Sequence, residues 1–134
     1  MLKNLWRFSP NTVLKQMIPS FSTLPTAQVL QMLSAEDWAA FGAMFERQAS
    51  GSGFILDIEH NVTKETLQKI DVPTLIVHSR KDNSVSFDHA EYARENIAYA
   101  ELFEANTWGH LVWLGPGSDE AKIKVAEFLR ARSV

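Results

Sequence analysis

Two residues of this 134-residue chain, Asp82 and His110, have the types and the spacing that acid–base chemistry needs. A carboxylate that accepts a hydrogen bond from one imidazole nitrogen fixes the tautomer of the ring and leaves the other nitrogen free to take a proton. Asp82 comes four residues after an apolar run that ends at His78. His110 closes the loop that follows a second run, which ends at Glu104. The pair is a candidate catalytic site if the two runs are neighbouring strands.

The elements that must position this pair lie in residues 71–134, where strands and helices alternate. The first apolar run is continuous and β-branched, which is typical of a strand buried on both faces. Two strands joined by one helix pair in parallel, so the loops that follow them emerge at the same edge of the sheet. The sequence therefore predicts an α/β unit in which Asp82 and His110 meet. The expected strands cover residues 73–78 and 100–104, and the expected helices cover 86–97 and a last segment from Ser118.

The pattern of residues 1–70 predicts a helical segment, and no convincing strand is recognisable in it. Apolar residues recur there at helical spacing, and Ser34 with Asp37 forms a start that is similar to a capping box. We expect this segment to cover one face of the sheet. The predicted helices begin near Pro10, Pro25, Ser34 and Thr63.

The composition sets limits on function. The chain is 46% hydrophobic with a net charge of −3, and its Lys and Arg residues are scattered, which disfavours a nucleic-acid partner. No apolar stretch approaches the roughly 18 residues of a transmembrane helix, and no signal peptide is recognisable. A cytoplasmic protein without a membrane partner is therefore expected. The chain has no cysteine, which excludes disulfides and thiolate metal sites, and no cofactor is indicated.

Two segments around the candidate pair resemble the α/β-hydrolase family. Residues 72–85, VPTLIVHSRKDNSV, resemble its acid-bearing strand and loop, and residues 108–111, WGHL, resemble its Gly-His base loop. Residues 1–70 resemble the helical cap of that family. The resemblance implies the C-terminal portion of a hydrolase sheet, two parallel strands with flanking helices, in which Asp82 is the acid and His110 the base of a catalytic triad.

The nucleophile of that family is absent from the sequence. It belongs in a Gly-x-Ser-x-Gly elbow ahead of the acid, but the nearest string, residues 50–53 (SGSG), has serine at the first required position. Two smaller departures are Ser79, where the family usually has glycine, and Ser86, where it often has proline. The resemblance thus predicts a fragment of a serine-type hydrolase that supplies Asp82 and His110, acts on a small-molecule ester or acyl substrate in the complete protein, and is inactive alone.

Other interpretations stay open at this stage. The chain could be a non-catalytic module that folds or oligomerises without turnover. A metal site made by Asp82, His78 and His110 is conceivable, although no ligand-spacing signature supports it. His60, His78 and His89 are assigned no catalytic role. Because an unpaired strand edge is a template for pairing, a homo-oligomer is expected, formed through the exposed sheet edge or by exchange of the N-terminal helices.

Overall fold

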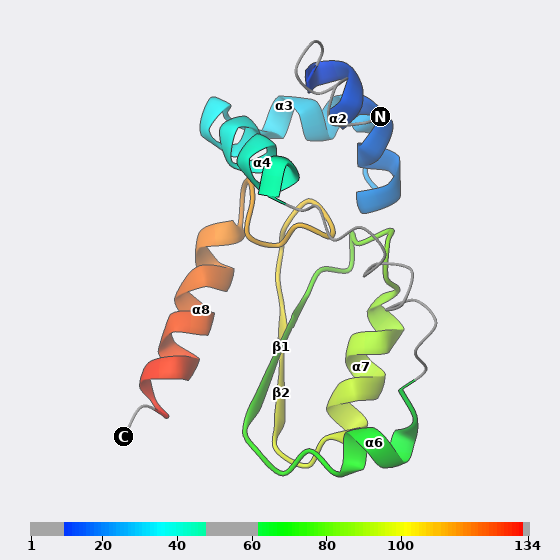
Figure 1. The fold of residues 1–134 in the computed structure, drawn as a ribbon, viewed down its shortest axis with the longest axis vertical. Helices are drawn as coiled ribbons and strands as arrows, with labels where there is room; N and C mark the ends of the chain where they lie inside the picture. The colour runs from blue at the N-terminus through cyan, green and yellow to red at the C-terminus, as the bar shows by residue number, and fades with distance from the viewer. Residues whose placement is uncertain (1–9, 48–61, 133–134) are drawn as a thin grey trace.

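A computed structural model describes residues 10–47 and 62–132 of the chain (Figure 1). A group of helices precedes a small parallel sheet, whose strands alternate with two further helices. The elements in chain order are α2 (Pro10–Phe21), α3 (Thr26–Met32), α4 (Ala35–Arg47), α6 (Lys64–Gln68), β1 (Thr74–His78), α7 (Phe87–Asn96), β2 (Ala100–Glu104) and α8 (Ser118–Arg130). In the described ranges each helix is too short or too polar to cross a bilayer.

The sheet has the predicted parallel pairing. Thr74 lies opposite Ala100 at one end, and His78 lies opposite Glu104 at the other. Helix α7 makes the connection and packs against both strands, and Figure 1 shows the sheet between α7 and α8. Because the strands run in the same direction, the loops after His78 and after Glu104 leave the sheet at the same end, so the predicted α/β fold is confirmed.

Local capping explains where several helices begin. Ser34 Oγ accepts a hydrogen bond from Asp37 N, and Asp37 Oδ2 accepts one from Ser34 N, which is the reciprocal pattern of a capping box. The side chains of Thr63 and Ser86 likewise accept hydrogen bonds from the first turns of α6 and α7. These starts agree with the sequence prediction, because each depends on residues no more than three positions apart.

Two expectations about the sheet were wrong. All five residues of β1 are half-buried, whereas the apolar run predicted a strand buried on both faces. The N-terminal helices do not cover a sheet face either, since α2, α3 and α4 lie beyond the carboxyl ends of the strands (Figure 1). Among the described elements, α7 and α8 are the helices beside this two-stranded sheet, and they leave every residue of β1 partly accessible.

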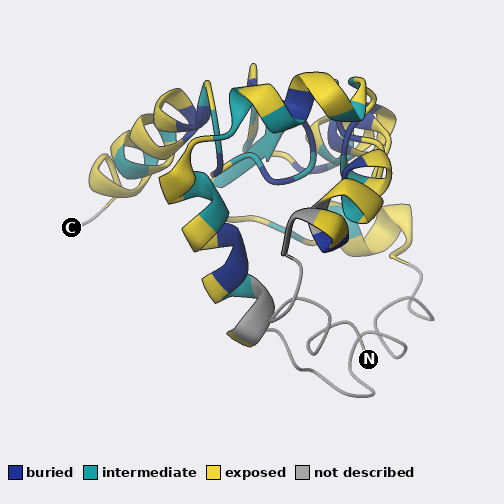
Figure 2. Cartoon of the chain, turned by 90° about the horizontal axis from the view of Figure 1, so that it is seen from above, coloured by how far each residue is buried: buried dark blue, intermediate teal, exposed yellow. Residues whose placement is uncertain are grey.

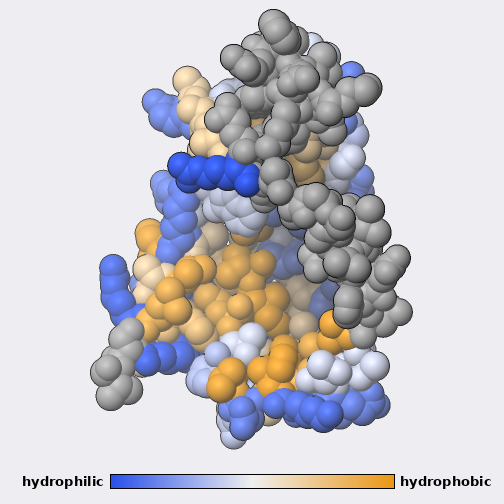
Figure 3. Space-filling model, in the orientation of Figure 1, coloured by the Kyte–Doolittle hydropathy of each residue, from blue (hydrophilic) through white to orange (hydrophobic). Residues whose placement is uncertain are grey.

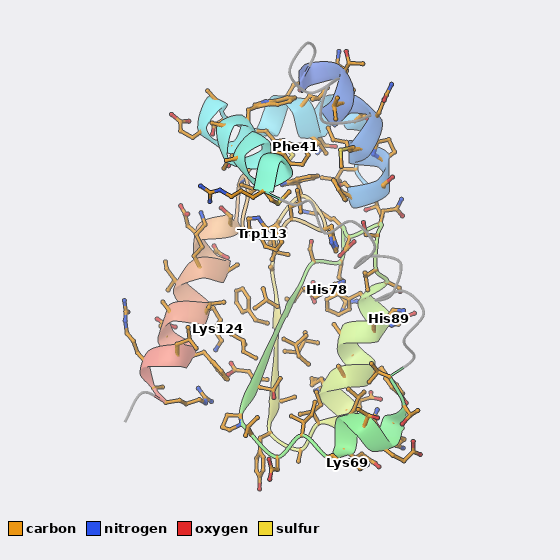
Figure 4. The ribbon with its side chains drawn as sticks, in the orientation of Figure 1. Phe41, Lys69, His78, His89, Trp113 and Lys124 are labelled. Carbon is orange, nitrogen blue, oxygen red and sulfur yellow. The ribbon has the colours of Figure 1, made fainter. Side chains whose placement is uncertain are left out.

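A cluster of buried apolar residues lies between the N-terminal helices and the loop after β2. At its centre the indole of Trp108 is fully buried, and its Nε1 donates a hydrogen bond to Leu114 O at 3.0 Å. Trp113, by contrast, is 47% exposed and lies near the carboxyl ends of the strands, close to the start of α8 (Figure 4). This core therefore attaches the helices to the base loop. The buried members of the cluster are Ile18, Val29, Phe41, Trp108, Leu111 and Leu114.

The two tryptophans provide a test of where the core lies. We expect Trp108→Phe to lower the free energy of unfolding by about 1–3 kcal/mol, because it leaves the Leu114 carbonyl without its buried donor. Trp113→Phe, the matched control, should change it by less than about 0.5 kcal/mol, as exposed substitutions usually do. Urea denaturation followed by circular dichroism measures both. Equal effects of the two changes would contradict this placement of the core.

Candidate active site

The structure brings Asp82 and His110 into direct contact. Asp82 lies in the loop after β1, His110 lies in the loop after β2, and His110 Nδ1 is 2.8 Å from Asp82 Oδ2. The Asp82 side chain is 3% exposed and the His110 side chain is 36% exposed. An ionised carboxylate can only accept, so Nδ1 carries the proton and Nε2 is left as a proton acceptor. The predicted contact between the two side chains is confirmed. A buried carboxylate accepts a hydrogen bond from a partly exposed imidazole.

The second carboxylate oxygen of Asp82 holds the side chain in place. Asp82 Oδ1 accepts hydrogen bonds from Ser84 N at 2.7 Å and from Val85 N at 3.0 Å. This is the local turn that aspartate favours in loops. The loop therefore wraps around its own carboxylate, which leaves Oδ2 to face His110.

The end of α2 is tied to the acid loop. We call Pro19–Thr23 the clamp segment. Its residues exchange hydrogen bonds with the loop that carries Asp82, and Ser22 pairs with Asp82 as an isolated antiparallel bridge. A segment some sixty positions earlier in the chain thus holds the loop that carries Asp82 in position. The bonds are Thr23 N to Lys81 O at 2.9 Å, Asn83 Nδ2 to Pro19 O at 2.7 Å and Ser84 Oγ to Ser20 O at 2.6 Å.

The same clamp segment holds the base loop. His110 N donates to Phe21 O at 2.8 Å, and the Phe21 ring stacks on the His110 imidazole with centroids 5.8 Å apart. The buried Ser22 hydroxyl donates to Trp108 O. Because one short segment grips both loops, the relative position of acid and base does not depend on the sheet alone.

Close approach explains the glycine before the base. A Cβ built on Gly109 would lie 2.3 Å from Phe21 O and 3.1 Å from the Ser22 Cβ. No side chain fits at that separation, so glycine is required here for space. The Gly-His pair is in this way a consequence of how tightly the clamp segment packs on the base loop.

The two departures from the family pattern both have partners in the structure. The Ser79 hydroxyl is buried and donates to Thr107 O at 3.2 Å, which joins the acid loop to the base loop. Lys81 Nζ makes a second link between these loops, to Asn106 Oδ1 at 2.9 Å. Ser86 caps α7. Neither change disturbs the candidate pair.

Of the other residues that the sequence analysis considered, some lie near the site and some do not. His78 Nε2 lies 3.4 Å from Asp82 Oδ2, a proximity that the sequence analysis considered only as part of a conceivable metal site. Its spacing of four residues from Asp82 was the available signal. His89 is exposed on α7, and His60 and residues 50–53 lie outside the described part of the chain. Within that part no group of three or more His, Asp or Glu could hold a metal ion.

Two charged side chains, Asp37 and Arg80, form hydrogen bonds between segments that lie near the site. Burial raises the pKa of Asp37, but hydrogen bonds from Ser34 and from Gly115 N, the latter at 2.8 Å, outweigh it and hold that pKa below its ordinary value. Asp37 thereby ties α4 to the segment that follows the base loop. Beside the acid loop, the hydrogen bond from Arg80 to Glu104, 2.9 Å long, raises the pKa of Arg80.

Comparison with known proteins places these features in a family context. The α/β-hydrolase family model described as TAP-like protein matches residues 44–134. An uncharacterized hydrolase of Bacillus subtilis is 37% identical over 124 residues, which are 91% of this chain and 44% of that protein. The chain thus spans less than half the length of this curated relative.

Solved structures show the same fold. An α/β-hydrolase fold protein from Nakamurella multipartita has a TM-score of 0.73 at 23% identity, over 99% of this chain and 50% of that one. An esterase from Exiguobacterium antarcticum has a TM-score of 0.54 at 26% identity, over 97% and 45%. 2-Hydroxy-6-oxo-6-phenylhexa-2,4-dienoate hydrolase from a Rhodococcus species has a TM-score of 0.53 at 21% identity, over 94% and 47%.

The Asp37 bridge predicts a pH-dependent stability. The pKa of Asp37 is lower in the folded than in the unfolded chain, so the folded state binds fewer protons and gains stability as pH rises. This contribution is present above the unfolded pKa of about 3.9 and is lost as pH falls through the folded value. We expect Asp37→Asn to flatten the decline in thermal stability between about pH 5 and pH 3. Glu36→Gln on the same turn is the control, and an unaltered profile in Asp37→Asn would refute the bridge.

Proposed function

This chain belongs to the TAP-like family of α/β-hydrolases, and from that premise we propose that Asp82 and His110 are the acid and base of a serine-type ester or acyl hydrolase. The observation that carries the proposal is the 2.8 Å hydrogen bond between His110 Nδ1 and the buried Asp82 carboxylate. It leaves one imidazole nitrogen as proton acceptor at the end of the sheet where open α/β folds place their sites.

The proposed chemistry follows from this geometry. His110 Nε2 takes the proton of a serine hydroxyl while the serine oxygen attacks the acyl carbon of the substrate. Asp82 stays ionised and stabilises the imidazolium that forms. His110 then gives the proton to the leaving oxygen as the acyl–oxygen bond breaks. Phe21, stacked on the imidazole, keeps the ring in plane through both transfers.

The nucleophile would come from outside these 134 residues. No Gly-x-Ser-x-Gly elbow occurs in the sequence, and the chain spans less than half of its Bacillus relative. We propose that the missing part, in the same protein or in a partner, brings the serine and the oxyanion-hole donors. It would pair with the edge of β1 that faces away from β2 and has no partner among the described strands, because an open strand edge is completed most directly by another strand.

An apolar groove lies between β1 and α8. Its volume is about 580 Å³, and Figure 3 shows hydrophobic surface gathered over this face. Helix α8 is largely exposed (Figure 2), with Val125 39% and Ile123 57% accessible. In the absence of the missing part we propose that a second copy covers the groove. The lining residues are Val77, Val112, Trp113, Ala121, Lys122, Val125, Ala126 and Leu129.

Serine labelling tests the proposed activity. The purified chain alone should take no label from a fluorophosphonate probe and show no esterase turnover, because its sequence lacks the Gly-x-Ser-x-Gly elbow that would carry the nucleophile. Co-expression with the part of the Bacillus subtilis relative that this chain does not match should restore both, with the label on a serine of that part. In the reconstituted enzyme, Asp82→Asn should lower turnover by about 10⁴-fold.

The matched control for this assay is a histidine away from the site. His110→Ala should abolish labelling in the reconstituted enzyme, whereas His89→Ala on the exposed side of α7 should leave it unchanged. Stoichiometric labelling of a serine in the isolated chain, lost in His110→Ala, would show instead that the nucleophile lies within these residues.

Light scattering tests the proposed self-association. At micromolar concentration the isolated chain should form a dimer, and Val125→Lys, which places a charge in the groove, should shift it to monomer. Ile123→Lys changes a neighbouring exposed residue of α8 outside the groove lining and should leave the dimer intact. A monomeric wild-type chain with a cooperative thermal transition would sink the proposal.

A further inference from the structure

A second histidine touches the acid of the candidate pair. His78 ends β1, and its Nε2 lies 3.4 Å from Asp82 Oδ2, the same oxygen that faces His110. This Nε2 also lies 3.1 Å from Val85 O. A carbonyl oxygen can only accept, so Nε2 carries the proton and donates it to Val85 O, while the Asp82 carboxylate lies within ion-pair distance. The imidazole is 15% exposed.

His78 closes the loop that carries Asp82. Val85 N donates to Asp82 Oδ1 at 3.0 Å, while Val85 O faces His78 Nε2. Val85 is therefore held through both of its backbone groups. The His78 ring is itself fixed by an edge contact with Phe87 at the start of α7, with centroids 5.6 Å apart at 77° (Figure 4 labels His78).

Three hydrogen bonds hold the Asp82 carboxylate, and His78 lies beside them. Backbone N–H groups of Ser84 and Val85 donate to Oδ1, and His110 Nδ1 donates to Oδ2. His78 Nε2 lies 3.4 Å from Oδ2 but donates its hydrogen bond to Val85 O. A lost donor destabilises its acceptor unless another donor replaces it. His78 therefore constrains the carboxylate mainly through Val85, whose N–H is one of the three donors.

We infer that His78 is a positioning residue for the Asp82–His110 pair. It keeps the acid loop closed through Val85 and so keeps Asp82 Oδ2 aimed at His110 Nδ1, without contacting substrate. The inference rests on the proposed function, because only a working acid–base pair needs its acid held in one orientation. Its test reads the hydrogen bond directly and requires no turnover.

Nitrogen NMR of the isolated chain measures the effect. At about pH 9, well above the pKa of an ordinary imidazole, wild-type His110 should be in the Nδ1–H form and His78 in the Nε2–H form. His78→Phe keeps a ring edge against Phe87 but removes the donor. We expect the ratio of Nδ1–H to Nε2–H forms of His110 to fall about fivefold, the effect of losing one ordinary hydrogen bond.

Two further variants separate positioning from general structure. His78→Gln restores an N–H donor and should return the His110 ratio towards the wild-type value, whereas the exposed His89→Phe should leave it unchanged. The indole N–H resonance of buried Trp108 reports whether each variant is folded. An unchanged His110 ratio in folded His78→Phe, or an equal fall in His89→Phe, would overturn the inference.

If His78→Phe does not fold, the protonated nitrogen of His78 in the wild-type chain provides the test. A slowly exchanging Nε2 proton on His78 would support the inference, and a His78 ring protonated on Nδ1 would overturn it. Failure of reconstitution to give turnover would refute the proposed function while leaving this readout intact, so the two outcomes are distinguishable.

Discussion

The buried carboxylate of Asp82 is the constraint on which the arrangement depends. A side chain that is 3% exposed has to be given donors by the protein, because water cannot supply them. Two come from its own loop and one from His110, while His78 lies 3.4 Å from the carboxylate and bonds to Val85 of the same loop. The parallel pairing of β1 and β2 makes these donors available, since it delivers both loops to one end of the sheet. A single buried charge thus organises two loops that are far apart in sequence.

The N-terminal helices pack against the loops that carry this site and hold them in position. The clamp segment (Pro19–Thr23) bonds to both loops, Asp37 ties α4 to Gly115, and the Trp108 core attaches α2, α3 and α4 to the base loop. Most apolar burial in the described part of the chain is therefore found at the end of the sheet that carries Asp82 and His110. Such support is what a precisely oriented catalytic pair requires, because small misplacements of reacting groups are costly.

The side of the sheet is built differently from its end. No residue of either strand is fully buried, and an apolar groove separates β1 from α8. The chain spans about half of the length of the solved relatives. The well-packed carboxyl end of the sheet and the uncovered groove beside β1 agree with our proposal. In that proposal the chain holds the acid and base of a hydrolase and receives the nucleophile on an adjoining surface. Family membership follows from the comparisons, and the division of labour is our proposal.

The sequence by itself determined the local elements and the meeting of Asp82 with His110. Capping at Ser34, Thr63 and Ser86 depends on neighbours within three residues, and the parallel topology follows from a strand–helix–strand pattern. Only the tertiary structure decided that the helices buttress the loops instead of covering a sheet face, that Trp108 is core while Trp113 is exposed, and that His78 contacts the acid. These outcomes depend on contacts such as Phe21 with His110, between segments almost ninety residues apart, and no periodic pattern in the chain encodes which distant surfaces will meet.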